Sequence, residues 1–308
     1  MQQRQLGTSG PLLSVIGLGC NNFGMTIGEE ASARVVHAAL DAGVTFFDTA
    51  DIYGDTNSEV FLGRAIAGRR EEVVIATKFG MRVDPRRHGA RPEYVRQAAD
   101  DSLRRLGTTY IDLYQLHTPD PTVPIADTLG ALDDLVRAGK VREIGCSNFT
   151  VEALDESRTG APPDRARFVS VQNEYSLLHR DPESDVLPAC ERLGLAFLPY
   201  FPLASGLLTG KYVRGTAPPP GTRLSQGWAS RFVSDERLAT VEALTAYASA
   251  RGHTMLELSV SWLASQPAVA SVIAGATRAE QVVANAAAAG WRLTAAERAE
   301  IDRITKQG

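Results

Sequence analysis

Cysteine is scarce in this 308-residue sequence, and long apolar runs and dense basic runs are missing. Three cysteines, Cys20, Cys146 and Cys190, are too few and too unevenly spaced for a disulfide framework or a metal site, so we expect reduced, packed thiols and no metal. A net charge of -4 without a dense Lys/Arg run gives no basis for binding nucleic acid or a membrane surface. Because no apolar run approaches ~20 residues and the first residues form no signal region, we expect a cytoplasmic protein.

A repeating unit of helix, glycine and strand is present instead. Glycines follow amphipathic helical patterns and precede apolar runs, where a left-handed helix cap is needed, at Gly43, Gly68, Gly107, Gly139, Gly194 and Gly252, and less regularly at Gly160 and Gly290. The runs after these glycines are almost continuously apolar, as expected of strands covered on both faces. About eight such units predict an α/β protein, either a doubly wound sheet or a closed barrel.

The first strand-to-helix turn favours the barrel. A dinucleotide-binding fingerprint needs a third glycine, and Asn22 stands at that position in the segment from Gly17 to Gly24. Polar groups instead follow several separate apolar runs, as at the C-terminal face of a (β/α)8 barrel. We therefore predict one TIM-barrel domain over residues 1–308, with an N-terminal β-hairpin (residues 4–6 and 12–15) at its bottom. Extra C-terminal helices complete the prediction, the last being Thr294–Ile304 with a Thr294/Glu297 capping box.

Four residues at or just past strand ends carry the chemistry. Asp48 ends an apolar run, and Tyr53 follows five residues later; Lys78 and His117 end the next two runs. A phenol has an ordinary pKa of about 10 and needs a nearby cation to act as an acid near neutral pH. A barrel aldolase that uses Lys78 as a Schiff base is an alternative, although it would call for desolvation of Lys78 rather than an Asp48 partner.

These four residues resemble the catalytic tetrad of the aldo-keto reductases. Six further blocks occur in that family's order, at residues 17–24, 48–54, 145–149, 172–175, 206–211 and 275–277. The resemblance covers nearly the whole chain and is strongest to the branch containing bacterial aldo-keto reductases and potassium-channel β subunits. It implies that Tyr53 protonates a substrate carbonyl, that Lys78 paired with Asp48 favours the phenolate, and that neutral His117 orients the carbonyl.

The resemblance also implies NADPH as cofactor, since none of these side chains can supply a hydride. Gly19 and Asp48 belong to its expected site. The nicotinamide carboxamide is expected on Ser147, Asn148 and Gln172 with Tyr200 stacked on the ring, and the pyrophosphate near Leu203, Ser205, Gly206 and Lys211. The adenosine end is expected at Gly275, Thr277, Arg278, Gln281 and Asn285.

Two details bear on this cofactor site. Phe201 stands where the family commonly has serine, which removes one hydroxyl contact. A capping box between Thr277 and Glu280 is predicted to occupy the Glu280 carboxylate, so that Arg278 is free to contact a 2'-phosphate.

The substrate is expected to be a small carbonyl compound. Its pocket is predicted to be walled by Phe23, Tyr53, His117, the 118–124 loop and Trp228, on a long loop over residues 205–234. This apolar set does not select among aldehydes, quinones and keto-sugars. A nicotinamide-binding regulatory subunit with little turnover remains an alternative. The oligomeric state is open, with a monomer expected.

Overall fold

The computed structural model describes residues 1–162, 164–220, 222–225 and 233–306. Its main feature is an 8-stranded parallel sheet in the order β10-β3-β4-β5-β6-β7-β8-β9. The strands are β3 (Ile16–Gly19), β4 (Phe46–Asp48), β5 (Val74–Phe79), β6 (Ile111–Leu116), β7 (Val141–Ser147), β8 (Phe168–Gln172), β9 (Ala196–Phe197) and β10 (Val272–Gly275).

The sheet closes into a barrel between β9 and the chain leading into β10. Phe197 forms a parallel bridge to Val269, donating its N–H to Ala268 O at 2.7 Å and accepting from Ala270 N at 3.1 Å. The predicted TIM barrel is therefore confirmed.

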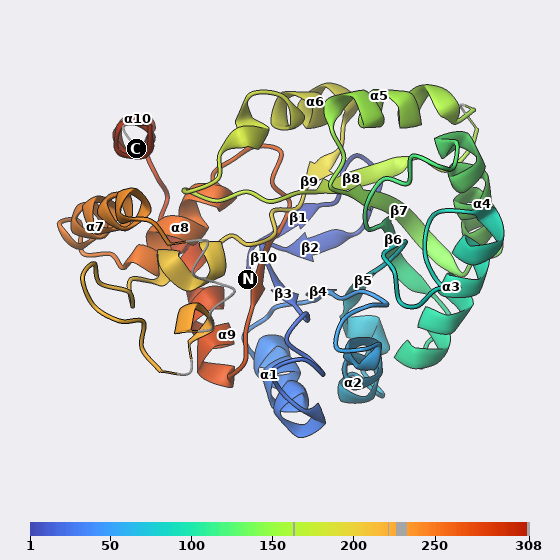
Figure 1. The fold of residues 1–308 in the computed structure, drawn as a ribbon, viewed down its shortest axis with the longest axis horizontal. Helices are drawn as coiled ribbons and strands as arrows, with labels where there is room; N and C mark the ends of the chain where they lie inside the picture. Colours follow the sequence, from blue (N-terminus) through green and yellow to red (C-terminus); the bar gives the residue numbers. More distant parts are fainter. Residues whose placement is uncertain (163, 221, 226–232, 307–308) are drawn as a thin grey trace.

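Helices surround this barrel, and those of the C-terminal region gather on one side of it (Figure 1). The α-helices are α1 (Glu29–Asp41), α2 (Asn57–Ala65), α3 (Pro92–Leu106), α4 (Ile125–Arg137), α5 (Val151–Gly160), α6 (Val186–Leu193), α7 (Asp235–Ser249), α8 (Met255–Ala264), α9 (Ala279–Ala287) and α10 (Ala295–Thr305). Short 3-10 helices are η1 (Arg70–Glu72), η2 (Asp181–Glu183), η3 (Ala204–Thr209), η4 (Arg223–Ser225) and η6 (Ala288–Gly290).

Local sequence signals explain several element boundaries. The six regular glycines of the predicted repeat have a positive φ, the conformation that glycine adopts at little cost, whereas Gly160 and Gly290 do not, because they lie inside α5 and η6. The capping box at the start of α10 is present, since Thr294 Oγ1 accepts from Glu297 N at 3.2 Å and Glu297 Oε2 accepts from Thr294 N at 2.7 Å.

The predicted hairpin also forms, from β1 (Gln3–Gln5) and β2 (Leu12–Ser14). Leu6 and Leu13 are fully buried against side chains from the barrel strands, including Phe46, Leu113 and Leu198. Arg4 fastens the hairpin by donating to Val269 O at 2.7 Å and Ala264 O at 2.6 Å. The hairpin therefore fills the barrel at the end away from the polar strand termini.

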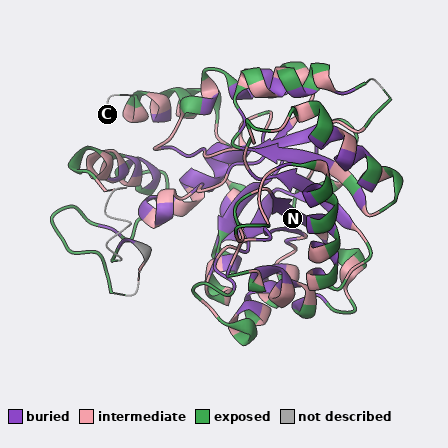
Figure 2. Cartoon of the chain, turned by 45° about the vertical axis from the view of Figure 1, so that its right-hand side comes forward, coloured by how far each residue is buried: buried purple, intermediate pink, exposed green. Residues whose placement is uncertain are grey.

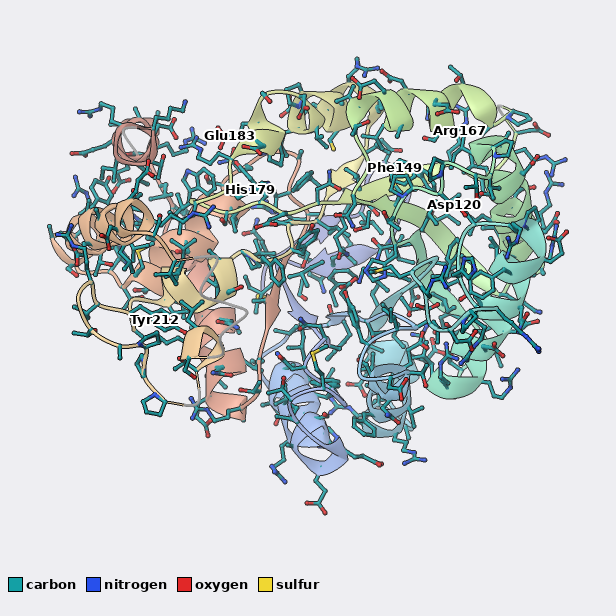
Figure 3. The ribbon with its side chains drawn as sticks, viewed as in Figure 1. Asp120, Phe149, Arg167, His179, Glu183 and Tyr212 are labelled. Carbon is teal, nitrogen blue, oxygen red and sulfur yellow. The ribbon has the colours of Figure 1, made fainter. Side chains whose placement is uncertain are left out.

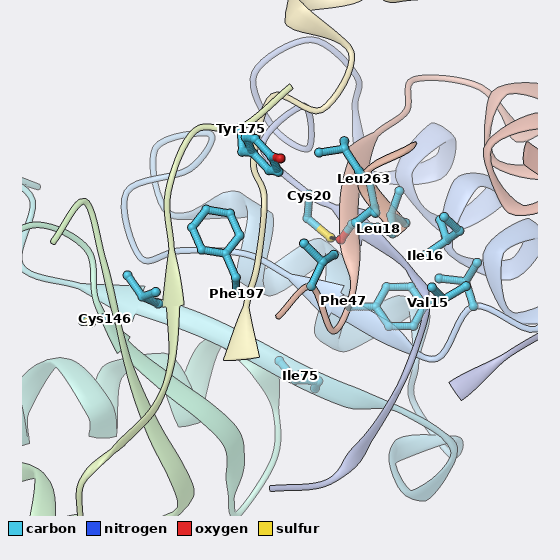
Figure 4. Close-up of a cluster of buried hydrophobic side chains, with 14 of the residues drawn as sticks. Val15, Ile16, Leu18, Cys20, Phe47, Ile75, Cys146, Tyr175, Phe197 and Leu263 are labelled. Atoms are coloured by element: carbon cyan, nitrogen blue, oxygen red, sulfur yellow. Dashed lines mark hydrogen bonds between the residues drawn. The ribbon is translucent and has the colours of Figure 1, made fainter. Parts of the chain in front are cut away.

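A larger apolar layer lies between the strands and the helices (Figures 2 and 4). The strands are almost entirely buried, whereas the helices expose their outer faces (Figure 2). Cys20, Cys146 and Cys190 are buried free thiols, as predicted. This packing leaves the C-terminal strand ends as the place where polar side chains converge.

Candidate active site

The tetrad residues meet at the C-terminal ends of β4, β5 and β6. Lys78 is fully buried, and its Nζ donates to Asp48 Oδ2 at 2.6 Å and to Thr49 O at 2.9 Å. The same Nζ lies 3.5 Å from Tyr53 Oη and 5.1 Å from the centre of the Tyr53 ring. The structure thus joins carboxylate, ammonium and phenol in one chain of polar contacts.

Burial and charge together set the pKa values of the groups in this chain of polar contacts. Burial lowers the pKa of Lys78, but Asp48 and Tyr53 outweigh it, so that the pKa is raised and the ammonium stays charged. Burial raises the pKa of the Tyr53 phenol, and the charge of Lys78 opposes that rise. Tyr53 therefore holds its proton near neutral pH while a cation stands beside its oxygen.

His117 completes the group from the residue after β6. Its ring meets the Tyr53 ring edge to face, with centroids 5.7 Å apart. Burial, assisted by the charge of Lys78, lowers the pKa of His117 to about 3, so the imidazole is neutral. Its buried Nδ1 has no hydrogen-bond partner among the described residues.

The amide and hydroxyl side chains at the ends of β7 and β8 form a second connected group. Ser147 Oγ donates to Gln172 O at 2.7 Å, and Asn148 Nδ2 donates to Ser147 Oγ at 3.2 Å and His117 O at 2.9 Å. Tyr200 Oη donates to Asn148 Oδ1 at 2.8 Å. Gln172 Nε2 donates to Asp48 Oδ1 at 2.9 Å, which connects this group to the tetrad.

The segment after Tyr200 has an unusual backbone. Phe201, Ala204 and Ser205 have positive φ values of 51°, 44° and 58°, a conformation that costs energy for residues with a side chain. Gly206 follows with φ 98°, and a Cβ built there would lie 3.2 Å from Lys211 Nζ. The turn therefore brings Lys211 next to Gly206, two of the residues predicted to lie near the pyrophosphate.

At the end of β10, the predicted Thr277/Glu280 capping box is wrong. Helix α9 begins one residue later than that motif requires, with Arg278 as its N-cap, so Glu280 cannot reach back to Thr277. Gln281 takes that place, and its Oε1 accepts from Thr277 N at 2.8 Å and Thr277 Oγ1 at 3.1 Å. Glu280 is consequently exposed beside Arg278, and only the Nε2 side of Gln281 is left for a ligand.

Comparisons with known proteins agree with this geometry. The model of the Aldo/keto reductase family matches residues 15–306. This chain belongs to the aldo/keto reductase family. It is 35% identical over 315 residues to aldo-keto reductase YhdN of Bacillus subtilis (strain 168), covering 99% of this chain and 93% of that protein. It also resembles the solved structure of glycerol dehydrogenase AKR11B4 from Gluconobacter oxydans, with a TM-score of 0.85, 32% identity and coverage of 99% and 95%.

Aldo-keto reductases are oxidoreductases that use NAD(P)H, and the polar groups at this strand edge suit a nicotinamide amide. Gln172 directs its Nε2 to Asp48 and Gln115, which leaves Oε1 without a hydrogen-bond donor among the described residues and able to accept from an amide. At the adenosine end, Asn285 is buried, and its side-chain amide makes no hydrogen bond to the described residues. Both observations fit a ligand with amide and adenine edges.

One expected pocket residue differs from the prediction. Phe23 is fully buried in the core of this aldo-keto reductase, where a Phe23–Ile27 bridge turns the chain inward, so its ring has no exposed surface. Gly54 lies so close to Phe23 O that a Cβ there would overlap it.

The other expected pocket residues have different outcomes. Trp228 lies outside the described residues, whereas Tyr53 is half-buried and His117 is 8% exposed.

Gln115 belongs to the site but was not predicted from the sequence. This buried residue pairs with Lys78 in the β5–β6 register, and its Nε2 donates to Asp48 Oδ1 at 3.2 Å. A glutamine inside an otherwise apolar run, two residues before His117, was the available signal. Asp48 therefore accepts from three side chains on three different strands, β5, β6 and β8.

Over residues 1–162, 164–220, 222–225 and 233–306, no group of three or more His, Cys, Asp or Glu side chains is arranged to hold a metal ion. In the same part of the chain, every helix is too short or too polar to cross a membrane.

Proposed function

We propose that this protein reduces an aldehyde or ketone to an alcohol with NADPH, using Tyr53 as the proton donor. The observation that supports this most directly is the buried contact chain from Asp48 through Lys78 to Tyr53, at 2.6 and 3.5 Å, beside a neutral His117. A protonated phenol, a fixed cation and a neutral imidazole are the groups that carbonyl protonation needs.

The side chains divide the work as follows. NADPH, when bound, supplies the hydride to the carbonyl carbon. Tyr53 gives its proton to the carbonyl oxygen, and the Lys78 ammonium stabilises the phenolate that remains. Asp48 keeps Lys78 charged and in place, while Gln115 and Gln172 hold the Asp48 carboxylate. Neutral His117 donates a hydrogen bond that positions the carbonyl oxygen.

NADPH rather than NADH is proposed because of Arg278. It is the only cation in residues 273–285, and its exposed guanidinium stands at the start of α9, where helix amides also attract phosphate.

The test is turnover of a panel of aldehydes, ketones and quinones with NADPH and NADH side by side, together with cofactor binding by fluorescence quenching. We expect turnover of at least one carbonyl class and tighter binding of NADPH. Tight cofactor binding without turnover would favour the regulatory subunit instead. Absence of cofactor binding, with substrate trapped on Lys78 by borohydride, would favour the aldolase.

A further inference from the structure

The segment between β5 and α3, residues 80–91, is here called the arginine loop. It carries Arg82, Arg86, Arg87 and Arg91 against a single acid, Asp84, although the whole chain has a net charge of -4. A local positive excess on an acidic protein attracts anions to that part of its surface.

The arginine loop is joined to the proposed active site at both of its ends. At one end, Phe79 O accepts from His117 N at 2.8 Å, and a Cβ on Gly80 would lie 2.9 Å from Leu116 Cδ1. Gly89 N donates to Gly80 O at 2.8 Å, which closes the loop upon itself. At the other end, Ala90 N donates at 2.9 Å to Asp120, which lies in the loop after His117 (Figure 3).

The interior of the arginine loop is ordered by its one acid. Asp84 Oδ1 accepts from the N–H groups of Arg86 and Arg87, each at 2.8 Å, and Asp84 Oδ2 accepts from Arg87 Nε at 2.7 Å. Val83 N also donates to Arg87 O at 2.9 Å. Asp84 is thereby fully used in shaping the loop and in neutralising Arg87.

The other arginines of the loop keep their charges available. The exposed guanidinium groups of Arg82, Arg86 and Arg91 make no ion pair or hydrogen bond with the residues that the structure describes. Arg91 lies near Asp120 and contributes to lowering the pKa of that carboxyl, against the effect of burial. On adjoining helix α3, by contrast, Arg96 and Arg104 are each paired with an aspartate at 2.7 and 2.8 Å.

We propose that Arg82 and Arg86 bind an oxyanion on the carbonyl substrate, which makes the substrate a small aldehyde or ketone bearing a carboxylate or phosphate. This inference rests on the proposed function, because it assumes that the carbonyl of the same substrate is bound at His117, beside the strand end from which the arginine loop starts. A guanidinium group matches either oxyanion with two parallel hydrogen bonds. The one acid of the loop, Asp84, is taken up by Arg87 and by backbone N–H groups, so it does not compete with the anion for these two arginines.

Matched substrates test this proposal. We expect the kcat/KM with NADPH to be about tenfold higher for 4-carboxybenzaldehyde than for its methyl ester, mainly through KM, and the ratio to fall as salt rises. Glyceraldehyde 3-phosphate against glyceraldehyde distinguishes a phosphate preference from a carboxylate preference. In R82Q/R86Q the ratios should fall toward one while turnover of the neutral aldehydes is retained. R303Q, an exposed change on α10, is the matched control and should keep the ratios.

Equal kcat/KM for charged and neutral partners, or a charged preference that persists in R82Q/R86Q, would overturn the anion site and leave the proposed function standing. No reduction of any aldehyde would count against the proposed function instead. Calorimetric binding of 4-carboxybenzaldehyde and its ester then tests the anion site alone. Tighter binding of the acid by wild type but not by R82Q/R86Q supports the site, and equal binding of acid and ester by wild type refutes it.

Discussion

At Tyr53, burial and charge act on the phenol in opposite directions. Burial raises the pKa of Tyr53, so the free protein keeps the proton, whereas Lys78 at 3.5 Å stabilises the phenolate that forms when the proton leaves. This contact strengthens as negative charge develops on the oxygen. The proposed role of Tyr53 is therefore an interaction made mainly in the transition state.

Replacement of Tyr53 by Phe isolates that interaction. We expect the kcat for carbonyl reduction to fall roughly a hundred- to ten-thousandfold, while the dissociation constant for NADPH barely changes, because only transition-state stabilisation is removed. Stopped-flow turnover and cofactor fluorescence titration measure the two quantities. Y110F, whose ring stacks between Arg70 and Arg142, is the control and should leave kcat unchanged. Near-normal turnover in Y53F would rule out Tyr53 as the proton donor.

At the scale of the element, the start of α9 determines the predicted cofactor preference. Glu280 is exposed two residues after Arg278, because the capping role went to Gln281. A charge-assisted contact from Arg278 to the 2'-phosphate contributes roughly 1.5 to 3 kcal/mol, or about ten- to a hundredfold in affinity. The free Glu280 carboxylate moves this preference toward the lower end of that range.

Two opposite substitutions follow from that arrangement. R278Q should weaken NADPH binding about tenfold and leave NADH binding nearly unchanged, whereas E280Q should strengthen NADPH binding alone. Fluorescence titrations of both cofactors at low and high salt measure the effects, with the larger difference at low salt. R298Q on α10 is the control. Equal weakening of both cofactors in R278Q would mean that Arg278 shapes the helix start instead.

The same element shows where sequence analysis succeeds and where it stops. The barrel was predictable because the glycine caps and apolar runs repeat, and the tetrad because its members lie at or just past the ends of successive runs. The Thr277/Glu280 error arose because a one-residue shift in the start of a helix changes which side chain reaches the cap. Gln115 and the burial of Phe23 depend on strand register and side-chain packing, which local patterns do not specify.

At the scale of the whole molecule, a buried acidic pair connects the β4 loop to the helical layer. Asp51 and Glu59 are 3% and 0% exposed, and Glu59 is held by Arg105 Nε at 2.6 Å and by Thr77. Asp51 receives a 3.4 Å hydrogen bond from Tyr94 Oη, and its Oδ1 has no partner among the described residues. Burial, together with the charge of Glu59, raises the pKa of Asp51 to about 7, while Arg105 acts to lower it.

This raised pKa makes folding stability depend on pH. An unfolded aspartate loses its proton near pH 3.9, so between about pH 4 and 7 the folded protein holds a proton that the unfolded chain has released. Stability therefore falls as pH rises through that window, by up to roughly 3 to 4 kcal/mol for a shift of this size. The full cost remains above pH 7, where Asp51 is charged in a buried site.

D51N should remove this dependence, because asparagine has a similar shape and does not ionise. We expect its free energy of unfolding in urea, relative to wild type, to rise progressively from pH 5 to pH 8. The slope is the readout, so any constant packing cost of the amide cancels from the comparison. D84N is the control: hydrogen bonding to Arg87 lowers the pKa of Asp84 to about 2, so that this carboxylate is ionised in both states throughout the range. If the free energies of unfolding of wild type and D51N change with pH in parallel, Asp51 is already charged at pH 5. The positive charge of Arg105 would then balance the negative charges of both Asp51 and Glu59.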